Sequence, residues 1–369
     1  MPATDLDMQM MDSALAHAKE GRPSPNPHVG AVVAQGEEVV SHGHHVRAGE
    51  EHAEGVALRL AGPRARGGTL YVTLEPCNHE GRTPPCVDAI LASGVARVVI
   101  GCIDPNPHVA GGGADRLRAA GVEVIVGVRD REARAVIAPW VKYVTTGLPY
   151  VALKLALSLD GRIATRSGAS KWVTGGDARH KVHEIRSRVD AVGIGIGTAL
   201  ADDPRLTVRE VAGASPARVI FDTSLRLSPT CQLATTAREV PTWVITVQTA
   251  SEEAEQALVE QGVEVLRVAQ SAEGRIDLAA GLRALAQRGV VSMLVEGGAE
   301  LAGSLLAARL PDELHVFVAP ILLGPRGRPA AVDWAGPDTP NDAPRILEPR
   351  WELCGSDVYV RGPLAFGAR

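Results

Sequence analysis

Aromatic residues and basic clusters are scarce in this 369-residue chain, and both shortages argue against the same class of protein. Phe, Trp and Tyr make up 3% of the residues, whereas binders of single-stranded nucleic acid use aromatic rings as stacking platforms. Lys and Arg number 38 against 43 Asp and Glu, and no basic block supplies the electrostatic footprint of a nucleic-acid binder. We therefore expect no nucleic-acid partner, although a local cationic pocket could still bind a phosphorylated small molecule.

Cysteines and long apolar runs are also few. The sequence contains five cysteines and no stretch that reads as a signal peptide or a membrane span. An odd and sparse set of cysteines argues against a disulfide framework. We expect a cytoplasmic protein with reduced thiols and no membrane association.

The length and the pattern of the chain predict two α/β domains. A chain of 369 residues is longer than one hydrophobic core usually accommodates, so we expect two domains. Strand and helix patterns alternate along the chain, which favours sheets covered by helices. The alternation pauses at TTGLP (145–149), so we place the domains at 1–146 and 147–369. In the first domain the predicted elements are helices at 6–20, 52–62, 83–94, 113–120 and 130–144, and strands at 29–34, 37–41, 69–75, 97–101 and 122–128. In the second they are strands at 150–158, 190–197, 218–222, 242–247, 263–268, 291–298 and 313–320, and helices near 177–189, 252–261, 277–288 and 299–309.

A candidate metal site lies around EPCNHEGRTPPC (75–86). His52 opens a predicted helix, Cys77 follows a strand, and Cys86 lies in the first turn of a helix that two prolines are suited to start. A His/Cys/Cys set is a zinc ligand set that leaves a fourth position for water. Glu54, two residues beyond His52, can then carry protons between that water and a leaving amine.

Other histidines and cysteines compete with this interpretation. His42, His44 and His45 are rival ligands, but consecutive imidazoles on a loop more often face solvent or bond locally. We expect the remaining cysteines, Cys102, Cys231 and Cys354, to be core or surface residues without a metal role.

These motifs resemble a known family. HAE (52–54) followed by PC and a second cysteine is similar to the zinc-dependent cytidine-deaminase-like superfamily, whose signature is H-x-E with P-C-x-x-C. Here eight residues separate Cys77 from Cys86, and this longer form, together with NPHVGAVV (26–33) and HHVRAGEEHAE (44–54), resembles the deaminase half of bifunctional riboflavin-biosynthesis deaminase–reductases. The resemblance places Asn26 and His79 near the substrate pyrimidine and leaves Arg82 as a possible phosphate contact.

The second half resembles the reductase of the same family, which has a dihydrofolate-reductase-like fold. The matching segments are KLALSLDGRIA (154–164), SGASKWVTG (167–175), LADDPRLTVR (200–209) and VEGGAELAGSLL (295–306). The resemblance assigns substrate binding to Lys154, Ser170, Arg186, Leu206, Arg209 and Glu296. It assigns binding of the NADPH cofactor to Ala156, Trp172, Thr198, Asp202, Ser224, Gly297 and Gly298.

Two of these assignments also have support from the residues themselves, although Gly297-Gly298 taken alone fits a simple tight turn equally well. Gly297-Gly298 ends a buried strand and opens a helix, where backbone N–H groups can approach a pyrophosphate. Lys154 interrupts an apolar strand, where an unpaired charge is costly, so a role in a site is favoured. An ordinary G-x-G-x-x-G dinucleotide motif with its acidic ribose contact is absent from the sequence.

The activity implied by the resemblance has two consecutive steps. The first is hydrolytic deamination of 2,5-diamino-6-ribosylamino-4(3H)-pyrimidinone 5′-phosphate with one zinc ion per chain. In the second, NADPH reduces the ribosyl group to give 5-amino-6-(5-phospho-D-ribitylamino)uracil. The family also suggests a homo-oligomer. Two alternatives stay open: a nucleic-acid editing deaminase with a non-catalytic C-terminal binding module, and a regulatory nucleotide-binding protein that has lost catalysis.

Overall fold

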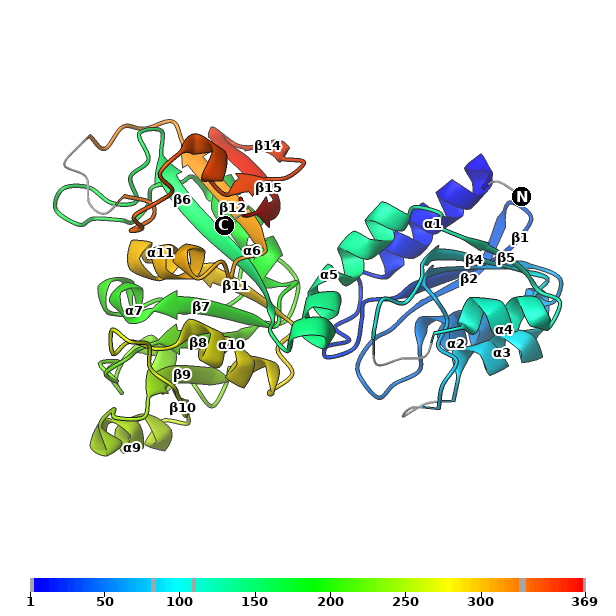
Figure 1. Ribbon diagram of the computed structural model, residues 1–369, viewed down its shortest axis with the longest axis horizontal. Helices are drawn as coiled ribbons and strands as arrows, with labels where there is room; N and C mark the ends of the chain where they lie inside the picture. The colour runs from blue at the N-terminus through cyan, green and yellow to red at the C-terminus, as the bar shows by residue number, and fades with distance from the viewer. Residues whose placement is uncertain (1–2, 81–83, 108–110, 325–329, 368–369) are drawn as a thin grey trace. The chain divides into compact units, whose positions relative to one another are not determined.

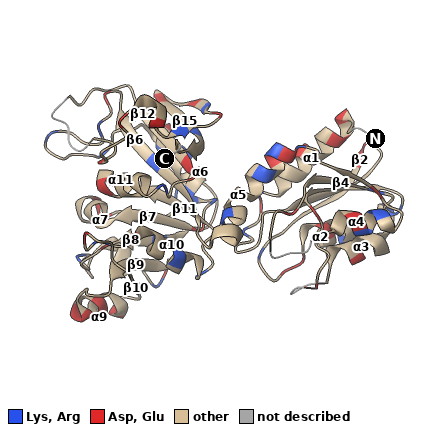
Figure 2. Cartoon of the chain, in the orientation of Figure 1, with Lys and Arg blue, Asp and Glu red and all other residues tan. Residues whose placement is uncertain are grey.

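A computed structural model describes residues 3–80, 84–107, 111–324 and 330–367. The chain forms two compact units, Met1–Gly147 and Leu148–Arg369, each with its own sheet (Figure 1). Among the described residues, none of the helices has both the length and the apolar character that spanning a bilayer requires. Acidic and basic residues are mixed along helix α5 (Figure 2), as expected for a solvated helix face.

The first unit is a five-stranded mixed sheet in the order β2-β1-β3-β4-β5. β1 pairs antiparallel with β2 and β3, whereas β3, β4 and β5 are parallel. The strands are β1 Gly30–Gln35, β2 Glu38–His44, β3 Thr69–Leu74, β4 Arg97–Cys102 and β5 Glu123–Val126. The helices are α1 Asp5–His17, α2 Ala53–Ala61, α3 Cys86–Ser93, α4 Gly113–Ala119 and α5 Asp130–Thr146, with a short 3-10 helix, η1, at Gly62–Ala65.

Helices cover both faces of this sheet, with α1 and α5 on one face and α2, α3 and α4 on the other (Figure 1). This arrangement explains why β1 and β3 are apolar on both of their faces and buried along most of their length. α1 begins with a capping box in which Thr4 and Asp7 satisfy each other's backbone N–H groups. The predicted alternation is confirmed here, although α3 starts at Cys86 and not at residue 83.

The second unit is built on a ten-stranded sheet, with β10-β9-β8-β7-β11-β6-β12-β15-β13 in order and β14 attached to β15. Its strands are β6 Tyr150–Ser158, β7 Ala191–Gly195, β8 Ala217–Phe221, β9 Thr242–Val247, β10 Glu264–Val268, β11 Ser292–Glu296, β12 Glu313–Ala319, β13 Arg345–Ile346, β14 Arg350–Cys354 and β15 Asp357–Ala365. Its helices are α6 Gly176–Arg186, α7 Ile196–Asp202, α8 Gln232–Thr235, α9 Glu252–Glu260, α10 Leu278–Ala286 and α11 Ala299–Ala307, with a 3-10 helix, η2, at Pro340–Asp342.

The parallel part of this sheet positions the loops that carry the predicted site. The strands from β10 through to β12 are parallel, and two apolar cores pack on the two faces of the sheet. The neighbouring strands β8, β7, β11 and β6 end near Ser224, Thr198, Gly297 and Ala156 respectively. Ligand sites in open α/β sheets lie outside the carboxyl ends of such strands.

The structure corrects the predicted elements of the second unit at several points. The strand predicted at 291–298 ends at Glu296, and α8, β13, β14 and β15 were not predicted. We predicted a strand over 190–197, but β7 ends at Gly195 and α7 starts at Ile196. Alternating glycine and isoleucine fit either a buried strand or a turn into a helix, because periodicity does not distinguish short apolar runs. The correction places Thr198 in the first turn of a helix and Asp202 at its last residue.

Candidate active sites

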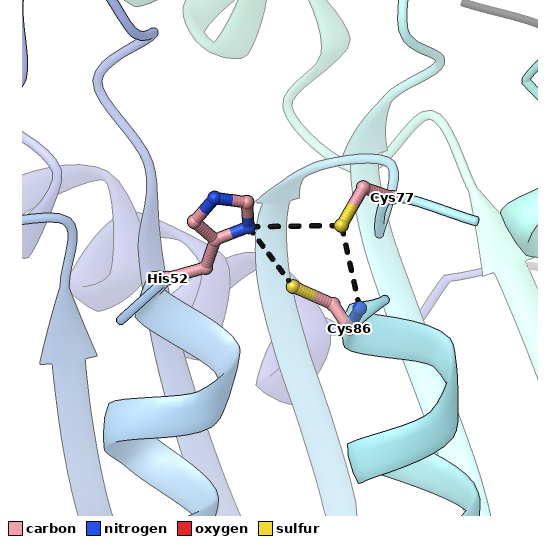
Figure 3. A group of neighbouring side chains, drawn as sticks. All are labelled: His52, Cys77 and Cys86. Carbon is pink, nitrogen blue, oxygen red and sulfur yellow. Dashed lines mark hydrogen bonds between the residues drawn. The ribbon is translucent and has the colours of Figure 1, made fainter. Parts of the chain in front are cut away.

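Three side chains of the first unit that could hold a metal ion converge at the start of two helices. His52 is the N-cap of α2, Cys77 follows β3, and Cys86 is the first residue of α3 (Figure 3). The Nδ1 atom of His52 lies 3.2 Å from Sγ of Cys86 and 3.6 Å from Sγ of Cys77. One ligand atom from each residue lies within 4.8 Å of the others, the one such group among the described residues.

These separations fit a zinc ion. Tetrahedral zinc with a nitrogen at about 2.0 Å and sulfurs at about 2.3 Å places its ligand atoms roughly 3.5–4 Å apart. A hydrogen bond from the Cys86 thiol, with His52 as a second contributor, lowers the pKa of the Cys77 thiol, and the same bond raises the pKa of Cys86. The backbone N–H of Cys86 also donates to this sulfur at 3.3 Å. Cys77 is therefore prepared to bind metal as a thiolate.

Glu54 lies in the first turn of α2, and its side chain is buried. Burial raises the pKa of its carboxyl group, and the neighbouring His52 partly opposes that shift. A carboxyl group with a raised pKa beside these three side chains is suited to accept and return a proton.

Asn26 is held by a histidine that we treated as a rival metal ligand. The amide nitrogen of Asn26 lies 3.0 Å from Nε2 of His45, and Nδ1 of His45 lies 3.1 Å from the carbonyl oxygen of Glu51. The ring of His45 stands edge-on to that of His52 at 5.1 Å. His45 therefore supports the site without joining the ligand group.

The other two rival histidines are engaged away from the trio. The ring of His42 stacks on His17 with centroids 3.8 Å apart, and Nδ1 of His44 lies 3.3 Å from Glu20. His79 is exposed and interacts electrostatically with Asp104. Arg82 falls outside the described residues.

Glu75 is a buried carboxylate beside this site that sequence reasoning did not single out. Its two oxygens accept the backbone N–H groups of Asp104, at 3.2 Å, and Ala114, at 3.0 Å. It joins the segment after β4 and the start of α4 to the residue before Pro76-Cys77. The one sequence feature that could have indicated a role for Glu75 is its position at the end of an apolar strand. Its backbone partners lie 29 and 39 residues away, so no local pattern shows them.

The second unit contains a cavity of about 1650 Å³. Every residue that we predicted for the second site lines it, although these residues span 154 to 298 in sequence. They are Lys154, Ala156, Ser170, Trp172, Arg186, Thr198, Asp202, Leu206, Arg209, Ser224, Glu296, Gly297 and Gly298.

The Gly297-Gly298 turn forms one wall of this cavity and faces Thr198. Both glycines have positive φ values, 111° and 81°, which side chains rarely adopt. A Cβ atom at either position would lie 3.3–3.4 Å from Oγ1 of Thr198. Gly298 is also the N-cap of α11. Because neither glycine has a side chain, a ligand can approach the backbone N–H groups at the positive end of this helix.

Charged side chains line another part of the cavity. Arg186 and Glu296 form a two-point ion pair, and Arg186 also donates to the carbonyl of Thr207 at 3.1 Å. Lys154 pairs in register with Glu296, and burial lowers the pKa of its amine. Arg209 is exposed and bonds through Nη1 to Thr207 Oγ1 at 2.9 Å, so its guanidinium is more open to an anion.

Ser170, Trp172 and Asp202 lie at the rim. Ser170 Oγ lies 3.3 Å from a carboxylate oxygen of Asp202, and Lys171 donates to the carbonyl of that residue at 3.0 Å. Trp172 is 70% exposed, with the guanidinium of Arg179 over its ring at 4.6 Å. A tryptophan of this exposure is a wall of the cavity and not a core residue.

Comparison with known proteins matches each half of the chain to a family. Residues 4–102 match the family model described as the cytidine and deoxycytidylate deaminase zinc-binding region, and residues 149–360 match the RibD C-terminal domain. The chain is 41% identical to riboflavin biosynthesis protein RibD of Escherichia coli (strain K12), covering 96% of this chain and 98% of that protein.

Solved structures give the same result along the full length. Acinetobacter baumannii RibD, form 1, is 38% identical with a TM-score of 0.85, covering 98% of this chain and 99% of that one. A diaminohydroxyphosphoribosylaminopyrimidine deaminase/5-amino-6-(5-phosphoribosylamino)uracil reductase from Thermotoga maritima is 35% identical with a TM-score of 0.85 and the same coverage.

The fold and the matched models define a two-domain enzyme with a zinc-binding deaminase domain and a reductase domain. The chain belongs to the RibD family of bifunctional riboflavin-biosynthesis enzymes. The predicted fold class, a cytidine-deaminase-like domain followed by a reductase domain, is confirmed, and so is the predicted pair of activities. The alternative of a non-catalytic C-terminal binding module is wrong, because that half matches the reductase domain of the family.

Proposed function

We propose that residues 1–146 deaminate 2,5-diamino-6-ribosylamino-4(3H)-pyrimidinone 5′-phosphate and that residues 147–369 reduce the product with NADPH. The reduction would convert the ribosyl group to ribityl and give 5-amino-6-(5-phospho-D-ribitylamino)uracil. The observation that carries this proposal is the convergence of His52, Cys77 and Cys86 in one unit. In the other unit, all the residues predicted for the reductase site line a single cavity.

In the deamination step, His52, Cys77 and Cys86 would hold zinc, and bound zinc would activate a water molecule as the nucleophile. Glu54 would take a proton from that water and deliver it to the leaving amine. Its burial beside the ligand group supports this role, because it keeps the carboxyl near the reacting atoms and away from bulk solvent. Asn26, fixed by His45, and His79 at the rim would contact the pyrimidine.

In the reduction step, the C1′–O4′ bond of the ribosylamino group would open to give an imine. Bound NADPH would supply the hydride to C1′ of this imine, and its nitrogen would take a proton from water or from the substrate phosphate. Gly297, Gly298, Thr198 and Asp202 would hold the cofactor with Ala156, Trp172 and Ser224, and the open backbone turn supports a pyrophosphate position there. Lys154, Arg186, Arg209 and Glu296 would hold the substrate with Ser170 and Leu206. Among the cations, the exposed Arg209 is best suited to meet the substrate phosphate.

The partners follow from this chemistry. We propose phosphorylated pyrimidines as substrates and no nucleic acid as a partner, supported by the acidic and aromatic-poor composition. We further propose a cytoplasmic homo-oligomer, as the sequence suggested.

A coupled assay tests the proposal. The purified full-length chain with one zinc per chain is given the diamino-pyrimidinone phosphate, and ammonia release and NADPH oxidation are followed separately. We expect ammonia first and NADPH oxidation after it, with NADH a poor replacement. Turnover with NADH equal to that with NADPH would contradict the cofactor assignment. Deamination of single-stranded DNA or transfer RNA by the same preparation would contradict the substrate class.

A further inference from the structure

His183 lies one turn before Arg186 on α6 and takes no part in the steps above. Its imidazole is 4% exposed and lines the cavity. Its Nδ1 atom accepts the backbone N–H of Arg209 at 3.2 Å. His183 therefore holds the backbone of a predicted substrate-binding residue, and through it the imidazole can affect substrate binding.

The segment that carries Leu206 and Arg209, here the 206–209 segment, has a backbone that needs external support. Leu206 has a positive φ of 54° although it has a branched side chain, a conformation that persists only where surrounding contacts impose it. Three contacts do so: Arg186 Nη1 donates to the Thr207 carbonyl at 3.1 Å, the Val208 N–H donates to Ser215 Oγ at 3.1 Å, and the Arg209 N–H donates to His183. Two of these three contacts come from α6.

The charges around His183 favour its neutral form. It faces Arg186 on its own helix, Arg209 and Glu210 on the neighbouring loop, and Glu296 at the end of β11. Burial, followed by the two arginines, lowers the pKa of the imidazole. The neutral ring can accept at Nδ1 and direct its Nε2–H toward Glu210, whose Oε1 lies 3.9 Å away. Protonation would place a second N–H against that of Arg209 and break the contact.

We propose that His183 is a positioning residue of the reductase: its Nδ1 atom holds the 206–209 segment so that Leu206 and Arg209 face the phosphorylated substrate. It acts through Arg209 and touches no reacting atom. The inference rests on the proposed function of the second unit. It adds His183 as the residue that keeps the substrate-binding 206–209 segment in place.

Two variants separate this role from a general effect on packing. In His183→Phe the ring volume remains but the acceptor is lost, whereas in His183→Asn the Oδ1 atom can replace Nδ1 as an acceptor that does not titrate. Both are compared with wild type as full-length zinc-loaded protein, with pre-deaminated substrate and NADPH, between about pH 5.5 and 8. His180→Phe, on an exposed part of the same helix, is the matched control.

For His183→Phe we expect the KM for the phosphorylated substrate to rise about five- to tenfold, the worth of one hydrogen bond, with kcat and the KM for NADPH little changed. Wild type should show a rise in substrate KM on acidification. His183→Asn should have a near-normal KM at neutral pH and should lack that rise. His180→Phe should behave as wild type at every pH.

The outcomes that would overturn the inference are distinct from failure of the proposed function. A wild-type KM in His183→Phe, or an undiminished acid-dependent rise in His183→Asn, would exclude the positioning role while reduction itself persisted. Absence of NADPH oxidation by wild type would overturn the proposed function and this inference together. If His183→Phe does not fold, the pH profile of His183→Asn decides the matter alone.

Discussion

The guanidinium of Arg186 binds both carboxylate oxygens of Glu296, with Nε 2.5 Å from Oε1 and Nη2 2.9 Å from Oε2. The two side chains are 11% and 8% exposed and come from α6 and from the end of β11. This ion pair fixes the helix to the sheet at the edge of the cavity.

Breaking this pair from one side should destabilise the protein more than removing both charges. We expect Arg186→Met or Glu296→Gln alone to lower the free energy of unfolding of the second unit by about 3 kcal/mol, because each leaves a poorly solvated partner. The double variant should lose clearly less than the sum. Urea unfolding of the wild type, the two single variants and the double variant gives the four free energies of unfolding of this double-mutant cycle. The control is Arg288→Met, which breaks the exposed pair with Glu264 and should lower the free energy of unfolding by less than about 1 kcal/mol. Strictly additive effects of the Arg186 and Glu296 substitutions would contradict the prediction.

Glu54→Gln should abolish ammonia release and leave the metal in place. The amide keeps the shape of the side chain but cannot transfer the proton, so we expect a loss of about 100- to 10,000-fold. Zinc content by elemental analysis and NADPH oxidation on pre-deaminated substrate should match wild type. The control is Glu51→Gln, one turn earlier, where the side chain is exposed and pairs with Arg59. Full deamination by Glu54→Gln would rule out the acid/base assignment.

Lys154→Met should impair reduction without affecting deamination. The change removes a charged donor from the cavity while retaining the aliphatic stem, so kcat/KM for reduction should fall about 10- to 100-fold. Lys181→Met, which removes a surface amine paired with Glu184 and Glu352, should leave both activities intact. Loss of ammonia release in Lys154→Met would indicate a folding defect instead.

Gly297→Ala should weaken cofactor binding. Its φ of 111° is unfavourable for alanine, and the added Cβ would lie 3.4 Å from Oγ1 of Thr198. We expect the Kd for NADPH, followed by quenching of tryptophan fluorescence, to rise at least about tenfold. At Gly176, where a Cβ meets only the far end of the Arg179 side chain at 3.8 Å, alanine should leave the Kd near that of wild type.

Asp7 should make the stability of the first unit sensitive to acid. Hydrogen bonds from Arg97, at 2.6 and 2.9 Å, hold the pKa of the buried Asp7 carboxyl well below its usual range, and Tyr71 donates a further bond at 3.0 Å. A depressed folded-state pKa contributes stability above the unfolded value, about pH 4, and that stability is lost as the pH falls below it. Asp7→Asn should therefore be less stable at pH 7 and show a flatter decline below about pH 4. Parallel acid profiles for the two proteins would contradict this.

The proximity of His52, Cys77 and Cys86 could be predicted from the sequence because all three lie in two short chain segments. His52 and Glu54 lie on one helix start, and Cys77 and Cys86 flank one loop, so helix geometry and ligand chemistry bring the argument close to the site. The order of strands and helices up to β12 followed from periodicity for the same local reason. The exceptions are α7, where alternating small residues show no helical period, and α8, which is too short to show one.

Other parts of the sites depended on contacts that no local pattern reveals. The partner of Arg186, Glu296, lies 110 residues away, so no local pattern distinguishes this arginine from a solvated one on a helix face. His183 and Glu75 act on backbone atoms of other loops, and His45 acts on a carbonyl of its own loop. A backbone acceptor or donor has no sequence signature. Only the assembled fold shows which polar side chain meets which turn.

The position of β6 has a consequence for synthesis of the protein. It comes first among the strands of its sheet, yet it pairs with β11 and β12, whose residues start at Ser292 and Glu313. Both edges of β6, an apolar strand, stay unpaired until more than half of the second unit has left the ribosome. Such edges recruit other chains, so a stall in translation before β11 should leave a nascent product that needs a chaperone.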